Sequence, residues 1–266
     1  MPALSTPRLA ALAALTLACG GSATAKLKLR NDTPAGLAAA VHGAALRLAA
    51  APALATSSPV APSLVGIKLI AVYLAEDVDP ATQDNVGRTS MIWLNAQCED
   101  DISACNVSGA AGSYAHRVTD YFDFARGTEA VNAALNSQGR AVDPGTYRYV
   151  RMEFCKLDPG TALTEPNFSW QAPPMAEPRS FSVGMCGVTS KPFATPLVLK
   201  AGDAASVTVA YDLTTTVVTG AAGTGSACFV TGADQVCYMD CVDDAVGGTR
   251  TCFNPPEFTP SAAAGL

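Results

Sequence analysis

Apolar and polar residues alternate in short stretches over most of the chain after residue 64. The clearest case is Ser206–Leu213, in which every second residue is large and apolar. These residues are Val207, Val209, Tyr211 and Leu213. Because successive side chains of a strand point to opposite faces, this period of two predicts a strand with one buried face. We expect it to be a central strand, with Val209 in the core and Thr208 on the other face.

A second central strand is predicted over Tyr147–Cys155. It follows Asp143-Pro-Gly-Thr146, a combination of residues that favours a tight turn. The stretch Leu64–Leu74 becomes apolar on both faces toward its end, as is typical of a buried strand. Shorter strands are expected at 89–94, 117–124 and 181–185.

One stretch, Thr128–Ser137, has the spacing of a helix. Val131, Ala134 and Leu135 would face inward, and Gln138-Gly139 would end the helix. Many short strands with Gly- and Pro-rich turns and a single short crossover helix indicate an all-β fold, a β-sandwich over residues 64–218.

The N-terminus has the form of a secretory signal. Arg8 is followed by the apolar run Leu9–Ala18, which is too short to span a bilayer, and then by Cys19. This is where a bacterial lipoprotein signal places the cysteine that receives the lipid, so residues 1–18 are predicted to be the signal peptide. Gly20-Gly21 follows without an aspartate, which favours the outer membrane of a Gram-negative bacterium. An ordinary secretory signal, cut after Ala23-Thr-Ala25, is the alternative.

Residues 19–63 are predicted to be an Ala/Pro-rich tether between the lipid and the domain. Thr33 and Pro34 resemble a helix start, and four apolar residues then share one helical face, which indicates a helix over 34–49. These four are Leu37, Val41, Ala45 and Leu48. The following 50–62, rich in Ala, Pro, Ser and Thr, is typical of a linker.

The charge balance argues against two kinds of partner. Loss of Arg8 with the signal peptide lowers the Lys and Arg count from 17 to 16, against 23 acidic residues, so the net charge goes from −6 to −7. A chain this acidic is not expected to bind nucleic acid or an anionic lipid surface through its charge. The lipid on Cys19 would therefore be its attachment to the membrane.

Eight cysteines remain when Cys19 carries a lipid, an even number that suits disulfides in an oxidising compartment. They are Cys98, Cys105, Cys155, Cys186, Cys228, Cys237, Cys241 and Cys252, the last four in a Cys-rich C-terminal extension over 219–266. Nearness along the chain favours Cys98 with Cys105, Cys155 with Cys186, and pairing of the last four among themselves. A zinc site made by the last four is the alternative, although their spacing contains no Cys-x-x-Cys.

No set of residues points to catalysis, and no catalytic residue is assigned. The nucleophile motif Gly-x-Ser-x-Gly of serine hydrolases is missing from the sequence. Asp77, Asp79 and Asp84 cluster after a predicted strand and are candidates for calcium, with a solvated acidic loop as the alternative. Trp170, before a Pro-Pro pair, is the candidate for an exposed ligand-binding ring, whereas Trp93 lies in an apolar strand and is expected to pack in the core.

Several segments resemble one family. They are Tyr121-Phe-Asp-Phe124, a short helix, Val142-Asp-Pro-Gly-Thr-Tyr-Arg-Tyr-Val-Arg-Met152, Pro196–Asp203 and Val207–Leu213. In this order they resemble bacterial surface lipoprotein domains of unknown function with a prealbumin-like (transthyretin-like) sandwich. The resemblance covers roughly residues 65–218, brings no catalytic residues with it, and implies a sandwich at the cell surface.

These observations together favour a non-enzymatic surface lipoprotein of the cell envelope. It would have a binding or structural role toward a protein or a polysaccharide, without a cofactor other than calcium. The alternative is an envelope hydrolase or carbohydrate-processing enzyme that uses carboxylates of the acidic loops. Two carboxylates that face each other across a cleft would favour the enzyme.

Overall fold

Strands dominate the computed structural model of the chain, which confirms the all-β prediction. The structure describes residues 21–34, 58–81, 84–98, 106–108, 114–116, 118, 120–154, 168–173, 175–181, 188–221, 228–231, 234–243 and 248–265. Within these residues the only α-helix is α2 (Thr128–Leu135), and no helix is long and apolar enough to cross a membrane.

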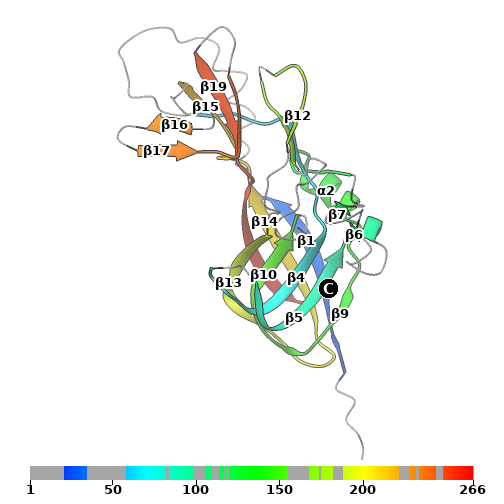
Figure 1. Cartoon of the computed structure of the whole chain (residues 1–266). Coiled ribbons are helices and arrows are strands. Elements are labelled where there is room, and N and C mark those ends of the chain that lie inside the picture. Colours follow the sequence, from blue (N-terminus) through cyan, green and yellow to red (C-terminus); the bar gives the residue numbers. More distant parts are fainter. Residues whose placement is uncertain are drawn as a thin grey trace, which may run out of the picture.

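Two four-stranded sheets pack face to face, and we call them the lower sandwich (Figure 1). The first sheet has the order β20 (Glu257–Ala264), β14 (Ala204–Asp212), β1 (Ala23–Asn31), β9 (Arg140–Val142). The second has the order β13 (Val188–Leu199), β10 (Gly145–Glu153), β4 (Ala71–Val78), β5 (Asn85–Leu94).

Two further sheets lie beyond the end of the lower sandwich at which β1 finishes, and we call them the upper sheets (Figure 1). One has the order β12 (Arg179–Phe181), β11 (Phe168–Gln171), β3 (Leu64–Ile67), β8 (Phe122–Asp123). The other has the order β18 (Asp240–Asp243), β19 (Thr249–Phe253), β15 (Val217–Ala221), β2 (Ser58–Pro59). Two hairpins, β6 (Asn106–Ser108) with β7 (Tyr114–His116) and β16 (Cys228–Thr231) with β17 (Asp234–Cys237), and the 3₁₀ helix η1 (Ala96–Cys98) complete the described elements.

The strand β1 corrects the predicted tether. It pairs in parallel with β14 along its whole length, from Thr24 opposite Ala204 to Asn31 opposite Tyr211. Its inward residues Ala23, Ala25, Leu27 and Leu29 are all buried. The alternation of Lys26-Leu-Lys-Leu is thus the pattern of a core strand. Residues 23–31 belong to the domain, and the predicted helix at 34–49 lies outside the described residues from residue 35 onward.

Helix α2 covers the outer edge of β1. The short β9 pairs with β1 only over Ala23–Ala25, which leaves later backbone groups of β1 without a strand partner. Side chains around the helix take that place: Asn132 accepts from the Leu29 amide at 2.9 Å and donates to its carbonyl at 2.7 Å. The Ser137 hydroxyl accepts from the Leu27 amide, and the Thr128 hydroxyl accepts from the Asn31 amide. The helix therefore completes the hydrogen bonding of the strand, as buried backbone groups require.

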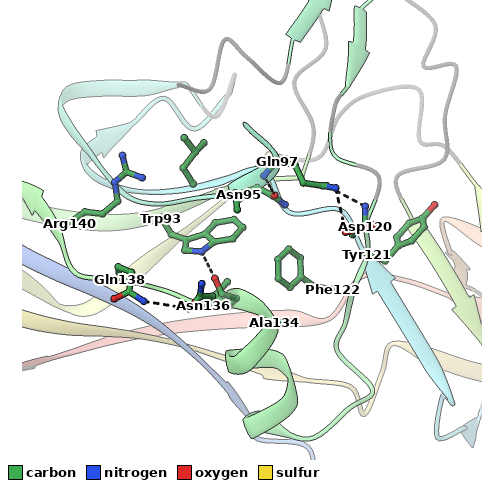
Figure 2. Close-up of a pocket in the computed structure, with 13 residues that line it drawn as sticks. Trp93, Asn95, Gln97, Asp120, Tyr121, Phe122, Ala134, Asn136, Gln138 and Arg140 are labelled. Carbon is green, nitrogen blue, oxygen red and sulfur yellow. Dashed lines mark hydrogen bonds between the residues drawn. The ribbon is translucent and has the colours of Figure 1, made fainter. Parts of the chain in front are cut away.

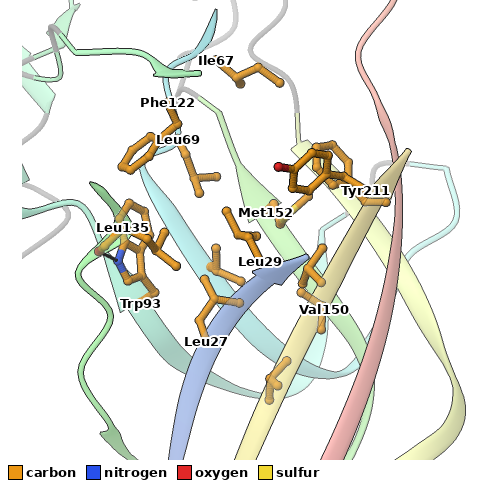
Figure 3. Packing of buried hydrophobic residues seen from close by; sticks show 14 of the residues in the cluster. Leu27, Leu29, Ile67, Leu69, Trp93, Phe122, Leu135, Val150, Met152 and Tyr211 are labelled. Carbon is orange, nitrogen blue, oxygen red and sulfur yellow. Dashed lines mark hydrogen bonds between the residues drawn. The ribbon is translucent and has the colours of Figure 1, made fainter. Parts of the chain in front are cut away.

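The core lies between the two sheets of the lower sandwich and continues up to α2 (Figure 3). Leucines of β1 meet Val150 and Met152 of β10, and Tyr211 of β14 packs edge-to-face on Phe124 with ring centroids 4.9 Å apart. Burial raises the pKa of Tyr211 to about 12. The predicted alternation is confirmed, since Val207, Val209, Tyr211 and Leu213 are buried and Thr208 is half-buried.

Other predicted elements are right in type but differ in extent. The stretch 64–74 is two strands, because the chain crosses from an upper sheet to the lower sandwich at Lys68–Ile70. Helix α2 stops at Leu135, where Asn136 adopts a left-handed conformation with φ 42°, and Ala134 is exposed rather than inward. The predicted C-terminal extension is part of the domain, since β20 pairs with β14.

The two faces of β14 give a direct test of the core. Val209→Asp would bury a carboxylate among apolar side chains and remove a Val contribution of about 1.5–3 kcal/mol, so we expect loss of folding. Thr208→Asp, one residue earlier on the half-buried face, should be far milder. Chemical denaturation followed by circular dichroism measures both, and equal damage would contradict the one-faced burial of this strand.

The edge contact between α2 and β1 can be tested with one isosteric change. Asn132→Asp keeps the acceptor for the Leu29 amide but replaces the donor to the Leu29 carbonyl with a charged oxygen. We expect a loss of about 1–3 kcal/mol in the free energy of unfolding. Ala133→Asp adds the same charge at the next, exposed position, and should cost much less. Similar losses in the two variants would mean that charge on the helix, not this contact, sets the stability.

Candidate functional site

A surface pocket of about 400 Å³ lies between the end of β5, the segment before β8, and helix α2 (Figure 2). Its lining residues are Trp93, Leu94, Asn95, Ala96, Gln97, Asp120, Tyr121, Phe122, Ala134, Leu135, Asn136, Gln138 and Arg140. Concave sites with an apolar floor and a few polar groups are the usual places for small ligands. We therefore take it as the candidate binding site.

Two aromatic side chains form the floor of the pocket. Trp93 and Phe122 pack edge-to-face, with ring centroids 5.6 Å apart and planes at 78°. The Trp93 indole Nε1 donates to the Leu135 carbonyl, the last residue of α2, at 2.9 Å. Both rings are largely buried, so the expectation that Trp93 packs in the core is confirmed. The bond ties the floor of the pocket to the end of the helix.

The wall on the η1 side is polar and internally bonded. Gln97 donates through Nε2 to the Asp120 carboxylate at 3.3 Å and accepts from the Asp120 amide at 3.4 Å. Asn95 links this wall to the core, because its side chain donates to the Leu69 carbonyl at 2.9 Å and accepts from the Gln97 amide at 2.8 Å. Asp120 is exposed and Gln97 half-buried, so both can be reached from solvent.

The opposite wall comes from the residues that follow α2. Asn136 ends the helix in the left-handed conformation, and its side-chain oxygen accepts from Gln138 Nε2 at 3.4 Å. Both amides are exposed, and Arg140 follows at the start of β9. In Figure 2 these residues and the pair Gln97–Asp120 lie on opposite sides of the aromatic floor. The pocket thus presents amide groups, a carboxylate and a guanidinium above two rings.

A second hollow of about 420 Å³ continues from the first around Tyr121. Tyr121 packs against Gly66, where a Cβ atom would come within 3.0 Å of the Tyr121 Cβ, so a larger residue would displace the ring. The Lys68 ammonium lies 5.2 Å from the ring centroid, within the range of a cation–π contact. Asp123 lines this hollow, but its carboxylate already accepts from the amides of Val65 and Ala125.

Trp170 is not an exposed ligand-binding ring, which corrects the prediction. Its side chain is 0% exposed and stacks on Phe253 with ring centroids 5.7 Å apart. Its Nε1 donates to Asp240 at 2.9 Å, and Arg179 Nε donates to the same carboxylate oxygen at 2.6 Å. This hydrogen bond raises the pKa of Arg179. The ring therefore joins the two upper sheets through a buried carboxylate, since Asp240 is 8% exposed.

The three calcium candidates lie around the turn between β4 and β5. Asp77 accepts from the Val78 amide at 2.9 Å, and Asp79 accepts from the Ala81 amide at 2.7 Å, so both stabilise the local backbone. Asp84 is exposed at the other side of the turn. Among the residues that the structure describes, no three of His, Cys, Asp and Glu come together as a metal site would require.

The cysteines are described in part. Cys241 of β18 and Cys252 of β19 form a disulfide between directly opposed strand positions. Cys98 is also disulfide-bonded, to a side chain outside the described ones. Cys228 and Cys237 are directly opposed in the pairing of β16 with β17. A disulfide between them agrees with the predicted pairing among the last four cysteines and stays a prediction. Cys19, Cys105, Cys155 and Cys186 lie outside the described residues.

The amide residues of the pocket carry no recognisable signal in the sequence. Gln97, Asn136 and Gln138 stand in a 3₁₀ turn and a helix end, where polar residues are common and carry no motif. Asp120 likewise belongs to no recognisable motif. The one available signal was the end of the predicted helix near Gln138-Gly139, which places polar side chains beside an apolar strand.

The carboxylate between the upper sheets can be tested against a matched ion pair. Asp240→Ala would leave the buried indole N–H of Trp170 without an acceptor and remove the partner of Arg179, so we expect a loss of about 1.5–3 kcal/mol in unfolding free energy. The exposed pair Arg30–Asp32 has the same 2.6 Å separation. Asp32→Ala should therefore be nearly silent. Denaturant titration compares the variants, and equal effects would show that burial of Asp240 does not matter.

Comparison with known proteins adds no assignment. No family model matches the chain, and no similar protein was found among curated proteins or solved structures. The sandwich that the resemblance implied is present in the structure, while membership of the prealbumin-like lipoprotein domains stays a prediction. The pocket and the topology are thus the basis for a functional proposal.

Proposed function

We propose that this chain is a non-enzymatic lipoprotein of the bacterial envelope, which binds a saccharide in the pocket beside α2. The observation that carries the proposal is the composition of that pocket. Exposed amides, a carboxylate and a guanidinium surround an aromatic floor in a cavity of about 400 Å³. A polysaccharide of the envelope is the partner that this chemistry suits.

The match to a saccharide rests on hydrogen-bonding chemistry. Each sugar hydroxyl both donates and accepts, and so does the side-chain amide of Asn or Gln. Gln97, Asn136 and Gln138 supply such groups from two sides of the pocket, and Asp120 adds an acceptor. The half-buried ring of Tyr121 and the exposed parts of Trp93 and Phe122 offer an apolar surface to the carbon-bound hydrogens of a sugar ring. Asp120 and Arg140 give the lining one charge of each sign, which suits a neutral ligand.

Hydrolysis of the saccharide is the less favoured function. Glycoside hydrolysis usually needs two carboxylates on either side of the scissile bond. Of the acidic residues in the described lining of the two hollows, Asp120 faces Gln97 and Asp123 is held by two backbone amides and by Arg126 at 3.3 Å. A carboxylate held in this way stabilises its loop and is poorly placed to act on a substrate.

Export to the envelope is supported by the cysteines. Disulfides persist in the periplasm and at the cell surface and are rare in the cytosol. The bonds at Cys241–Cys252 and at Cys98 fit that compartment. With the signal-like segment before Cys19, they favour a lipid-anchored protein of the outer membrane.

The anchor is tested by replacing its attachment point. Cys19→Ser should move the protein from the membrane fraction to the soluble fraction and abolish incorporation of a fatty-acid probe. Ser22→Ala, three residues away, leaves the lipid attachment site at Cys19 intact. This control variant should remain membrane-bound and labelled. Absence of label from the wild-type protein would overturn the lipoprotein assignment.

The pocket is tested by screening the intact protein on an array of bacterial oligosaccharides, followed by calorimetric titration with the best-bound one. Asp120→Asn should weaken binding by about tenfold or more, because a hydrogen bond to a charged group contributes about 1.5–3 kcal/mol, and Gln97→Ala by about two- to tenfold, because a neutral hydrogen bond contributes about 0.5–1.5 kcal/mol. Glu257→Ala, at an exposed position of β20, should bind like the wild type. Binding to no oligosaccharide, or unchanged affinity of the pocket variants with intact circular dichroism, would refute the saccharide site.

A further inference from the structure

The folded domain begins very close to the predicted lipid attachment site. Ala23 is the first residue of β1 and is 0% exposed, so the chain enters the core only four residues after Cys19. A fully extended chain advances at most about 3.3–3.6 Å per residue, so about 14 Å is the greatest distance between the Cα atoms of Cys19 and Ala23. The predicted tether over 19–63, with its 45 residues, would have allowed a much greater distance between the lipid and the domain.

The residues just before β1 are also fixed to the domain. The Ser22 carbonyl accepts from the Gly202 amide at 3.0 Å, and the Thr24 amide donates to the Asp203 carbonyl at 2.8 Å. A Cβ atom at Gly21 would lie 3.6 Å from that of Ala201, which shows how closely the two segments run. The turn between β13 and β14 thus clamps the chain from residue 21 onward, and little free chain is left to separate a lipid from the protein.

Other turns lie at the same end of the lower sandwich. Val142 pairs with Ala23, which brings the turn at Asp143-Pro144 beside the start of β1. Arg88 donates to the Pro144 carbonyl and so brings the first residues of β5, and the turn before them, to this end. The C-terminal strand β20 also finishes here, with Ala264 opposite Ala205. In Figure 1 the strand β1 starts at this lower end, and the upper sheets lie at the opposite one.

We propose that this lower end of the sandwich rests against the lipid headgroups and that the upper sheets, with the Cys241–Cys252 disulfide, are presented away from the membrane. The proposal rests on lipidation of Cys19, which is part of the proposed function. The turns at the lower end carry Asp79, Asp84, Asp143 and Asp203, with the cations Lys200 and Arg88 beside them, so the acidic side chains outnumber the basic ones. This acidic surface fits a zwitterionic headgroup layer, such as one of phosphatidylethanolamine, and is repelled by an anionic one.

The orientation also places the pocket. Strand β5 runs from Asn85 at the lower end to Leu94 at the pocket, because it is antiparallel to β4 and β4 is antiparallel to β10. The aromatic floor of the pocket therefore lies at the far end of β5, and its Arg140 wall, opposite Ala25 of β1, is the part nearest the headgroups. A polymer could reach it without contact with the bilayer.

Photocrosslinking of the full-length lipoprotein in vesicles of labelled phosphatidylethanolamine tests the orientation. A benzophenone amino acid at Ala201, in the exposed turn at the lower end, should crosslink to lipid, whereas the same group at Met239, 46% exposed beside the upper sheets, should not. A Gly/Ser insert of about 20 residues after Gly20, with a root-mean-square span of about 25 Å, should lower crosslinking at Ala201 several-fold. Replacing half of the lipid by phosphatidylglycerol should lower it as well.

The outcomes separate the two proposals. If Cys19→Ser protein stays in the membrane fraction with its label, the anchor itself is wrong and the orientation fails with it. If Cys19→Ser is released but Ala201 and Met239 of the lipidated protein crosslink equally, the anchor stands and the orientation is wrong. Unchanged crosslinking after the insertion would likewise overturn the short-linker explanation, and stronger crosslinking in the anionic vesicles would overturn the zwitterionic surface.

Discussion

The hydrogen bonding of β1 is the interaction on which the rest of this structure depends. On one side the strand pairs in parallel with β14, and on the other it is completed by β9 and by the side chains of Thr128, Asn132 and Ser137. A strand with both edges satisfied and an apolar inner face can lie in the middle of a sheet. Without it, β14 would lose one neighbour, α2 would lose its main polar contact, and the floor of the pocket would lose the helix end that carries Leu135.

Strands β14 and β10 were predictable from their local sequence, and β1 was not. The alternation of Ser206–Leu213 and the turn before Tyr147 are local features, so β14 and β10 could be placed from sequence alone. Strand β1 has a similar alternation, but it lies beside a signal-like segment and before an Ala/Pro-rich one, and its partners are far away in the chain. Parallel pairing leaves no turn residues between the two strands, so the sequence carries no local mark of it.

The same limit applies to the candidate site. Its amide residues come from a 3₁₀ turn and a helix end, and only the packing of α2 on β1 brings them to one cavity. Trp170 shows the converse, because a Trp next to prolines looked exposed although a carboxylate far along the chain, Asp240, binds its indole N–H. Aromatic side chains with a polar atom can be buried when a partner is available, and that partner cannot be read from neighbouring residues.

The parallel pairing of β1 with β14 has a consequence for how the protein reaches its folded state. In the export that we propose, the chain delivers β1 first, but the strand that must lie beside it arrives only after most of the sequence has crossed, and β20 follows it. The first sheet therefore cannot form early in translocation, and contacts between residues so far apart in sequence make folding slow. The apolar face of β1 stays exposed throughout that interval. If the protein is exported as proposed, a chaperone that shields short alternating segments would act on this strand before the rest of the first sheet.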